Sequence, residues 1–491
     1  MRRVGISLAL ASVLILAVSP IVGSYDAEIS QRTVIARYGK GYLEEDAQGN
    51  QILHLKGSPY EMGYQQGVLL SEGVEKITHD YVAKLLFVMM SLDISGYDLG
   101  VLWTLIRKIL VELCLLNEKY IPEPYRLEMQ GVADGAGDNV TYEDVLLLNE
   151  AIDVLMSSVY FLAFTLGELI SIPLIIIEFL GDLFEDFPPV SSATTDASSH
   201  LSLPMGCNEF AVFGEGTTDG RLFHGRDFMF ANAGILQDYT LMRVAEPDEG
   251  YPFISSTAPG FVGLYDGMNI HGISIGTDMG PSRDNIPFKG AEGTLFVCRD
   301  VVQYASTLDE GIEKVRDAPR GSSWDYVISD GKIPDAAVLE TSAHFVEVRR
   351  PQDKYPDQVE EEPCLIAATN HYIHPKTKLL DRGFCYYGAI SMAGGGLESE
   401  WRYNYMVEKL VQNYSKIDVN TAKEIIDFLH PPNYDYLAFK YHSLSYTDDS
   451  TLAINGSISL FDPGNLEIWS LYGYYDRPWV HYSLKEELGL G

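Results

Sequence analysis

Residues 204–231 read PMGCNEFAVFGEGTTDGRLFHGRDFMFA and set the architecture of the second half of the chain. Strand-forming residues on both sides of the TTDG turn predict two strands joined as a hairpin. Cys207 stands at the start of the first strand, directly after Gly206. A cysteine in this place is either a small buried apolar residue or a nucleophile, and burial is the commoner fate of free cysteines.

The composition and length of the chain limit the partners and the number of domains that we expect. The chain has 491 residues, of which 46% are hydrophobic, and 35 Lys and Arg against 69 Asp and Glu give a net charge of −34. Such an acidic surface repels phosphate backbones, so we expect no nucleic-acid partner. The length suits two or three domains of roughly 100–200 residues each, or one large layered unit.

The N-terminus predicts export. Residues 1–24 contain two arginines, a long apolar stretch and then small residues, which is the layout of a signal peptide. The length of the apolar stretch also suits an uncleaved anchor. We therefore expect the protein outside the cytoplasm, either extracellular or on the outer membrane surface. The chain has five cysteines, and this odd number leaves at least one thiol unpaired. The five are Cys114, Cys207, Cys298, Cys364 and Cys385.

Residues 25–187 predict a mainly helical N-terminal region, because apolar residues recur there at helical spacing. Its end, residues 157–187, is almost wholly apolar, yet Glu168, Pro173 and Glu178 interrupt it. Buried charges oppose a membrane span. The segment therefore favours a helical hairpin that is either buried or associated with a membrane surface.

The amino-acid composition of the chain changes after this region. Residues 188–206 are rich in Pro, Ser, Thr and Ala, which predicts a flexible linker that ends at Gly206. Residues 207–491 contain clusters of short strands with two helical segments between them. This order predicts a layered α+β domain rather than a doubly wound parallel sheet.

Cleavage between Gly206 and Cys207 would give Cys207 both a thiol and a free α-amino group. An α-amino group titrates at about 7.7–8.0, so near neutral pH it can accept the thiol proton. Gly206 suits such a cut because a residue without a side chain tolerates unusual backbone angles. One residue would then act as nucleophile and base together.

With these features, GCNEFAVFGEGTTDGRLFHGRDF (206–228) resembles the nucleophile strand and hairpin of the N-terminal nucleophile (Ntn) hydrolases. It is most similar to the acyl-coenzyme A:6-aminopenicillanate acyltransferase group, related to penicillin V acylases, bile salt hydrolases and acid-ceramidase-like amidases. The resemblance implies autocleavage before the cysteine and a four-layer αββα fold with a helical proregion. Four more segments occur in the expected order: GSPYEMGYQQG (57–67), GLYDGMNIHGISIG (263–276), AATNHYIHP (367–375) and SEWRYNY (399–405).

The resemblance also implies roles for single residues. It places the Asn370 amide in the oxyanion hole, although Asn is also common in turns. It gives Arg402 a place in the active site, as it does Arg226, which otherwise could pair with surface acids. The other residues that it suggests for the substrate pocket are Tyr265, Asn269 and His371, and Asn269 could equally be a hairpin-turn residue.

One departure from the family affects the catalytic carboxylate. Many relatives carry G-R-N-x-D after the hairpin, whereas this chain has Gly225-Arg226-Asp227-Phe228-Met229. Met229 thus replaces the usual aspartate. Asp227 could supply a carboxylate, but neighbouring residues of a strand face opposite sides of a sheet.

These observations predict an exported, self-cleaving amidohydrolase or acyltransferase that acts on the amide or thioester of a small N-acyl or lipid-like substrate. We expect no cofactor and no metal, since His371 and His374 have no evident third ligand. Whether the N-terminal fragment stays bound after cleavage is open. Two alternatives remain: a catalytically silent cell-surface or lipid-binding protein with the same fold, and a thiol peptidase that pairs Cys207 with His371.

Overall fold

The computed structural model describes residues 32–89, 100–160, 206–230, 232–280, 282–286, 288–356, 358, 362–381, 397–428, 456–472 and 478–490. The predicted signal (1–24), most of the apolar segment 157–187 and the linker up to residue 205 lie outside these residues, as does Cys385.

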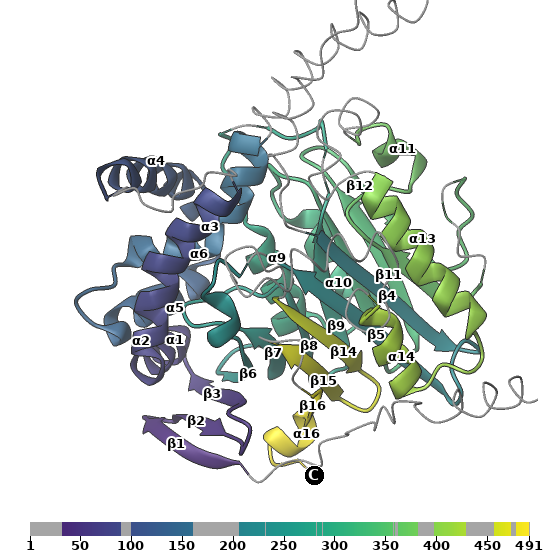
Figure 1. The fold of residues 1–491 in the computed structure, drawn as a ribbon, viewed down its shortest axis with the longest axis horizontal. Helices are drawn as coiled ribbons and strands as arrows, with labels where there is room; N and C mark the ends of the chain where they lie inside the picture. Colours follow the sequence, from purple (N-terminus) through teal and green to yellow (C-terminus); the bar gives the residue numbers. More distant parts are fainter. Residues whose placement is uncertain are drawn as a thin grey trace, which may run out of the picture.

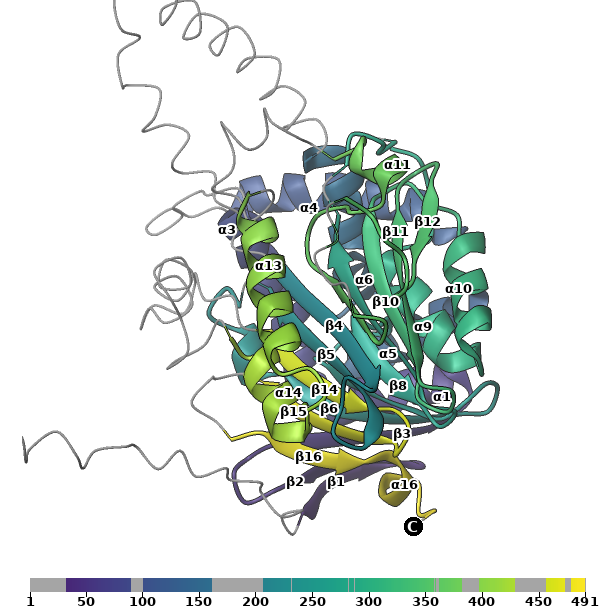
Figure 2. The ribbon, with the colours of Figure 1, turned by 90° about the vertical axis from the view of Figure 1, so that its right-hand side faces the viewer.

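Two sheets form the centre of the protein (Figures 1 and 2). The larger has ten strands, in spatial order β1 (Thr33–Tyr38), β2 (Gly41–Glu45), β3 (Gln51–Gly57), β6 (Leu241–Pro247), β7 (Phe253–Thr257), β8 (Asp266–Asn269), β9 (Ile273–Met279), β10 (Trp324–Asp330), β11 (Asp335–Thr341) and β12 (Val346–Arg349). The smaller has six, in the order β13 (Leu365–Ala368), β4 (Gly206–Gly214), β5 (Gly220–Met229), β14 (Ser457–Asp462), β15 (Glu467–Tyr472) and β16 (Val480–Ser483).

Helices cover the outer face of each sheet, as Figure 2 shows. The smaller sheet packs against α13 (Leu397–Gln412) and α14 (Val419–Ile426) through one apolar cluster. The larger sheet packs, through another cluster, against α9 (Thr294–Tyr304), α10 (Leu308–Asp317) and the N-terminal helices. Those N-terminal helices are α1 (Pro59–Leu69), α2 (Ser71–Glu75), α3 (Val82–Met89), α4 (Gly100–Glu118), α5 (Glu123–Ala136) and α6 (Tyr142–Val154), with π-helical turns at Lys76–Tyr81 and Leu155–Tyr160. The four-layer αββα arrangement is thereby confirmed.

The space between the two sheets is filled by apolar side chains in one region and by buried polar side chains in another. Ile52 and Ile254 of the larger sheet belong to the same cluster as Phe461 and Ile468 of the smaller one. Beside this apolar cluster, ionisable side chains also point between the sheets. They are buried because a strand residue that faces the other sheet is covered by it. These groups surround the start of β4 and carry the chemistry discussed below.

The helical description of the N-terminal region needs a correction. Residues 33–57 form three strands, and β3 pairs in parallel with β6, which lies after Cys207 in the chain. The sequence of β3, QILHLKG, lacks the alternation that marks a half-buried strand, because both of its faces are covered. The segments before and after the predicted cleavage site therefore share one sheet and one core.

The segment 57–67 is a helix-packing motif. Ser58 and Glu61 form a capping box that starts α1. A Cβ on Gly63 would lie 1.9 Å from the carbonyl oxygen of Glu128 on α5, and one on Gly67 would lie 2.3 Å from that of Val132. Only glycine allows the two helix backbones to come this close. Among the described residues, no helix combines the length and the apolar character that crossing a membrane would need.

Candidate active site

The hairpin of β4 and β5 sorts the predicted site residues onto two faces. Cys207 pairs with Phe228, and Glu209 pairs with Arg226, so these four side chains point between the two sheets. Asn208 and Asp227, which pair with each other, lie on the opposite face. The strand period of two thus separates Asp227 from the nucleophile.

Three predicted residues meet at Cys207. Its backbone N–H donates to Oδ1 of Asn370 at 2.7 Å. Nη2 of Arg226 donates to its Sγ at 3.2 Å, and Nη1 of Arg402 donates to its carbonyl oxygen at 2.6 Å. Asn370 follows β13 and Arg402 lies on α13, so both are distant from Cys207 in the sequence.

Asn370 presents its amide oxygen to Cys207. Besides the Cys207 N–H, Oδ1 accepts from Nη2 of Arg402 at 2.8 Å, whereas Nδ2 donates to the carbonyl of Met279 at 2.9 Å. An oxyanion hole needs the nitrogen. In the intact chain Asn370 therefore orients the backbone at the cleavage point, and its oxyanion role stays a prediction for the cleaved protein.

Asp227 lies on the helix side of the small sheet. Its Oδ2 accepts from Nδ2 of Asn208 at 3.0 Å, and Oδ1 of Asn208 accepts from Arg402 at 2.7 Å. Met229 is buried, and its sulfur accepts weakly from the same Asn208 amide at 3.4 Å. The Asp227 carboxylate is thus connected to Cys207 through Asn208 and Arg402.

Arg226 links Cys207 to two acids that the sequence analysis missed. Its Nε lies 2.8 Å from Oε1 of Glu209, and its Nη1 lies 3.5 Å from Oδ1 of Asp278 on β9. Nη2 also donates to the carbonyl of Thr277 at 2.5 Å. The position of Glu209 two residues after Cys207 was a usable signal, whereas the pattern around Asp278 gave none.

Burial controls the protonation of this group. Burial raises the pKa of the Cys207 thiol to about 12, although the charge of Arg226 acts in the opposite direction. Burial likewise raises the pKa of Glu209 to about 8 and lifts the pKa of Asp278 well above its usual range. In the intact chain, Cys207 is therefore a thiol at neutral pH.

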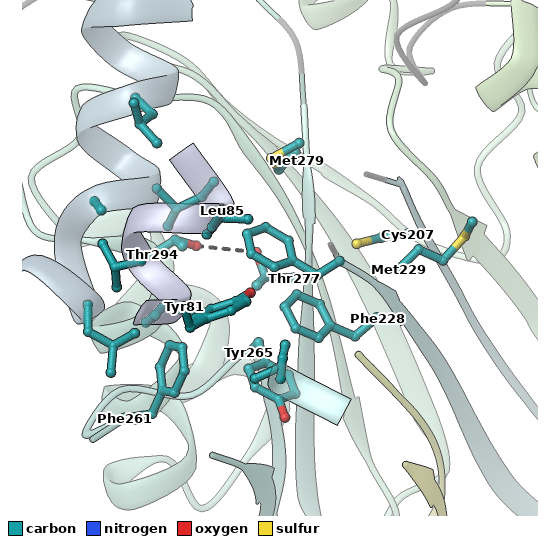
Figure 3. Close-up of a pocket in the computed structure, with 18 of the residues that line it drawn as sticks. Tyr81, Leu85, Cys207, Phe228, Met229, Phe261, Tyr265, Thr277, Met279 and Thr294 are labelled. Atoms are coloured by element: carbon teal, nitrogen blue, oxygen red, sulfur yellow. Dashed lines mark hydrogen bonds between the residues drawn. The ribbon is translucent and has the colours of Figure 1, made fainter. Parts of the chain in front are cut away.

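A pocket opens beside the sulfur (Figure 3). Its lining is apolar except for a few hydroxyl groups, and Tyr265 stacks on Phe228 with 4.1 Å between ring centroids. Residues from both sides of the predicted cleavage site contribute. From the N-terminal side these are Tyr81, Val82, Leu85, Leu148, Ala151, Ile152 and Leu155.

Asn269 and His371 lie outside the lining of this pocket. Asn269 donates to the carbonyls of Val302 and Ala305 at 2.8 and 2.7 Å, and so ties a hairpin turn to α9. Nδ1 of His371 contacts the hydroxyl of Ser399 at 2.9 Å. Burial lowers the pKa of His371 well below its usual range, so the ring is neutral and bound away from Cys207.

The sequence pattern of the acyl-coenzyme A:6-aminopenicillanic acid acyl-transferase family matches residues 215–469, more than half of the chain. The chain belongs to this family. An uncharacterized protein of Archaeoglobus fulgidus is 36% identical over 468 residues, which cover 91% of this chain and 68% of that protein.

Two solved structures are also similar. The N-acylethanolamine-hydrolyzing acid amidase ortholog of Caenorhabditis elegans is 14% identical, with a TM-score of 0.36 over 52% of this chain and 93% of that one. Penicillin V acylase from Agrobacterium tumefaciens is 13% identical, with a TM-score of 0.36 over 56% and 85%.

Proposed function

We propose that this protein is an exported amidohydrolase or acyltransferase whose nucleophile is Cys207, exposed as a new N-terminus by self-cleavage after Gly206. The observation that carries the proposal is the position of the Cys207 sulfur. It lies at the wall of an apolar pocket, 3.2 Å from the guanidinium of Arg226, while Asn370 holds the backbone nitrogen that cleavage would free.

In turnover, the α-amino group of Cys207 takes the thiol proton, and the sulfur attacks the acyl carbon of the substrate. The C–N bond breaks as the α-ammonium group returns the proton to the leaving amine, which leaves an acyl group on the sulfur. Water or an amine then takes the acyl group, and the thiol re-forms. Arg226 assists because a nearby positive charge lowers the free energy of the thiolate.

The pocket indicates the class of acyl group. Its phenyl, leucyl and isoleucyl walls offer little to a polar chain, whereas each buried methylene gains about 0.8 kcal/mol. We infer an N-acyl or lipid-like substrate with an apolar acyl part. Export rests on residues 1–24, and delivery of the substrate from a membrane surface rests on the apolar segment 157–187.

The N-terminal fragment would remain part of the active protein. It contributes seven residues to the pocket lining, and its Glu128 forms a buried ion pair with Arg299 of the other fragment at 3.0 Å. Strand β3 also holds a place inside the larger sheet. After cleavage, the two fragments should therefore co-elute in gel filtration under native conditions.

Denaturing electrophoresis and N-terminal sequencing test the proposal. The wild-type protein should give two fragments, and the Cys207→Ala variant a single chain. Purified cleaved protein should hydrolyse N-acyl amides, with loss of activity in Cys207→Ser. A catalytically silent protein is the second candidate, favoured by Met229 in place of the usual aspartate, and an intact wild-type chain without activity would favour it.

A further inference from the structure

A second cluster of titratable side chains lies where the C-terminal helix meets the edge of the larger sheet. Helix α16 (Leu484–Glu487) lies beside β1–β3 in both views of the fold (Figures 1 and 2). Glu44 on β2, His54 on β3 and Glu487 on α16 each turn one ligand atom into the same space, and these atoms all lie within 4.8 Å of one another. Elsewhere in the part of the chain that the structure describes, no group of His, Cys, Asp and Glu side chains converges in this way.

His54 points a buried nitrogen at the two carboxylates. Its side chain is 8% exposed, and among the described residues its Nε2 has no hydrogen-bond partner. Nε2 lies 3.7 Å from Oε2 of Glu44 and 3.6 Å from Oε2 of Glu487, which is too long for a hydrogen bond to either. Tyr42 stacks on the imidazole with 4.2 Å between ring centroids and so fixes its direction. One nitrogen and two carboxylate oxygens therefore face one another without a hydrogen bond between them.

The spacing of these atoms suits a bound cation. Zinc binds an imidazole nitrogen at about 2.0–2.1 Å and a carboxylate oxygen at about 2.0–2.2 Å. Two such ligands at tetrahedral to trigonal angles around one ion lie about 3.4–3.7 Å apart, which matches both distances from His54. A proton shared between the nitrogen and an oxygen would instead bring these two atoms to about 3.2 Å or less.

Arg32 supports Glu487 from behind and leaves the oxygen that faces His54 available. Its Nη2 donates to Oε1 of Glu487 at 2.5 Å, and its Nη1 lies 3.9 Å from Oε2 of Glu44, too far for a hydrogen bond. Burial and the charge of Arg32 lower the pKa of His54 to about 3, so the imidazole is neutral at neutral pH. Two carboxylates and one guanidinium then leave one negative charge at the cluster. Hydrogen bonds behind a ligating carboxylate are a common way to orient it toward a metal.

We propose that Glu44, His54 and Glu487 bind a divalent ion of the zinc class. An imidazole ligand favours zinc over magnesium and calcium, which prefer oxygen ligands alone. Zinc takes four ligands, so a water molecule would complete the set. Nothing in the sequence indicated a metal here, because ligands so distant from one another form no motif.

The ion would join strands β2 and β3 to the C-terminal helix. In the cleaved protein it would also join the two fragments, because Glu44 and His54 precede Cys207 and Glu487 follows it. Only this last consequence rests on the proposed function. The binding site itself is present in the intact chain.

Zinc titration of the full-length chain tests the proposal. Every chain carries Cys207→Ala, so that the thiol neither binds zinc nor cleaves the chain. His54→Phe keeps an aromatic ring in place and removes the nitrogen, and Glu487→Gln removes the charge and keeps the shape. His481→Phe is the matched control, because His481 contacts Glu467 at 2.5 Å in a pair that has no third ligand among the described residues.

Isothermal titration with zinc chloride follows removal of bound metal with EDTA. The parent chain and His481→Phe should bind one zinc ion more than either cluster variant, or bind it at least about tenfold more tightly. Because an ion that binds only the folded chain stabilises it, zinc should raise the melting temperature of the parent and the control by at least about 2 °C. The cluster variants should show no such rise, and neither should the parent with magnesium or calcium.

Equal zinc binding by the parent and by either cluster variant would overturn the inference. Loss of the site in His481→Phe, or equal stabilisation of the parent by magnesium or calcium, would overturn it as well. If His54→Phe does not fold by circular dichroism, Glu44→Gln at the partly exposed side of the cluster serves for the same comparison. Since no chain in this test can cleave at Cys207, its result is independent of the proposed function.

Discussion

The guanidinium of Arg226 lies 3.2 Å from the sulfur of Cys207 and 2.8 Å from the carboxylate of Glu209, so one buried cation serves the nucleophile and an acid together. The hairpin produces this arrangement directly. Glu209 and Arg226 are cross-strand partners, and Cys207 lies two residues before Glu209 on the same face. A charge enclosed in this way is poorly screened, and it therefore acts strongly on its neighbours.

Replacing Arg226 should disable the nucleophile. In Arg226→Gln the thiol loses the nearby charge that lowers its pKa, and two buried carboxyl groups lose their counter-ion. We expect activity on an N-acyl amide to fall by about 100-fold or more, the size seen when one stabilising donor is removed. Alkylation of Cys207 at pH 8, followed by peptide mass mapping, should slow as well.

The control for this variant is Arg221→Gln on the same strand. Arg221 is partly exposed and lies at the turn end of the hairpin, where it pairs with Asp219 at 2.7 Å and with the buried Asp462 at 3.1 Å. Its activity should equal that of wild type. An Arg226→Gln variant as active as Arg221→Gln would contradict the assigned role.

A substitution before the cleavage site should change substrate preference. Ala151 of α6 lines the pocket, and Ala151→Phe would fill part of it. Because the added ring occupies the space of the acyl chain, kcat/KM should fall for long-chain N-acyl amides and change little for short ones. Leu127→Phe, on an exposed position of α5, is the control. Equal losses for all chain lengths would argue that Ala151 does not border the acyl site.

The close contact between α1 and α5 should be sensitive to a single methyl group. A Cβ at Gly63 would meet the Glu128 carbonyl at 1.9 Å, so Gly63→Ala must push the helices apart. We expect the free energy of unfolding, from urea titration, to fall by about 1–3 kcal/mol. Gly311→Ala on α10 is the comparison, since its nearest neighbour is 3.3 Å away. Equal stability of the two variants would contradict this packing.

Asp153 should make stability depend on pH in a defined window. It accepts from the backbone N–H of Thr294, from Ser322 and from Trp324, and burial raises its pKa to about 6. The unfolded value is about 3.9, so between these pH values the folded chain binds more protons than the unfolded chain. The stability that Asp153 contributes is thus complete below about pH 4 and is lost as the pH rises through 6.

Thermal or urea unfolding of wild type and Asp153→Asn over pH 4–8 measures this contribution. The free energy of unfolding of wild type minus that of the variant should decrease from pH 4 to about 7 and then stay constant. A difference that is constant or that grows with pH over this window would show that Asp153 is not held protonated by burial.

The sequence predicted the parts of the fold that depend on local patterns. A side-chain period of two predicts the hairpin around TTDG, the position of Cys207 in its first strand and the placement of Asp227 on the opposite face of the sheet. The structure shows this arrangement. The two-sheet sandwich and the family were predicted by motif order. The contribution of β1–β3 to the larger sheet was missed, because a strand buried on both faces shows no alternation.

The site was predictable only where a motif names a residue. Arg226, Asn370 and Arg402 converge on Cys207, but the orientation of the Asn370 amide depends on Met279 and Arg402, which are distant in sequence. Asp278 and the pocket residues of α3 and α6 had no motif. Their role comes from the way in which two sheets and a helical layer meet, which no short stretch of sequence records.

The most direct measurement is the mass and N-terminal sequence of the larger fragment in material that hydrolyses an N-acyl amide. We predict a chain that begins Cys-Asn-Glu and extends from Cys207. Active protein whose residues 206 and 207 remain joined, or whose new terminus lies elsewhere, would contradict the claim that the freed amine of Cys207 serves its own thiol.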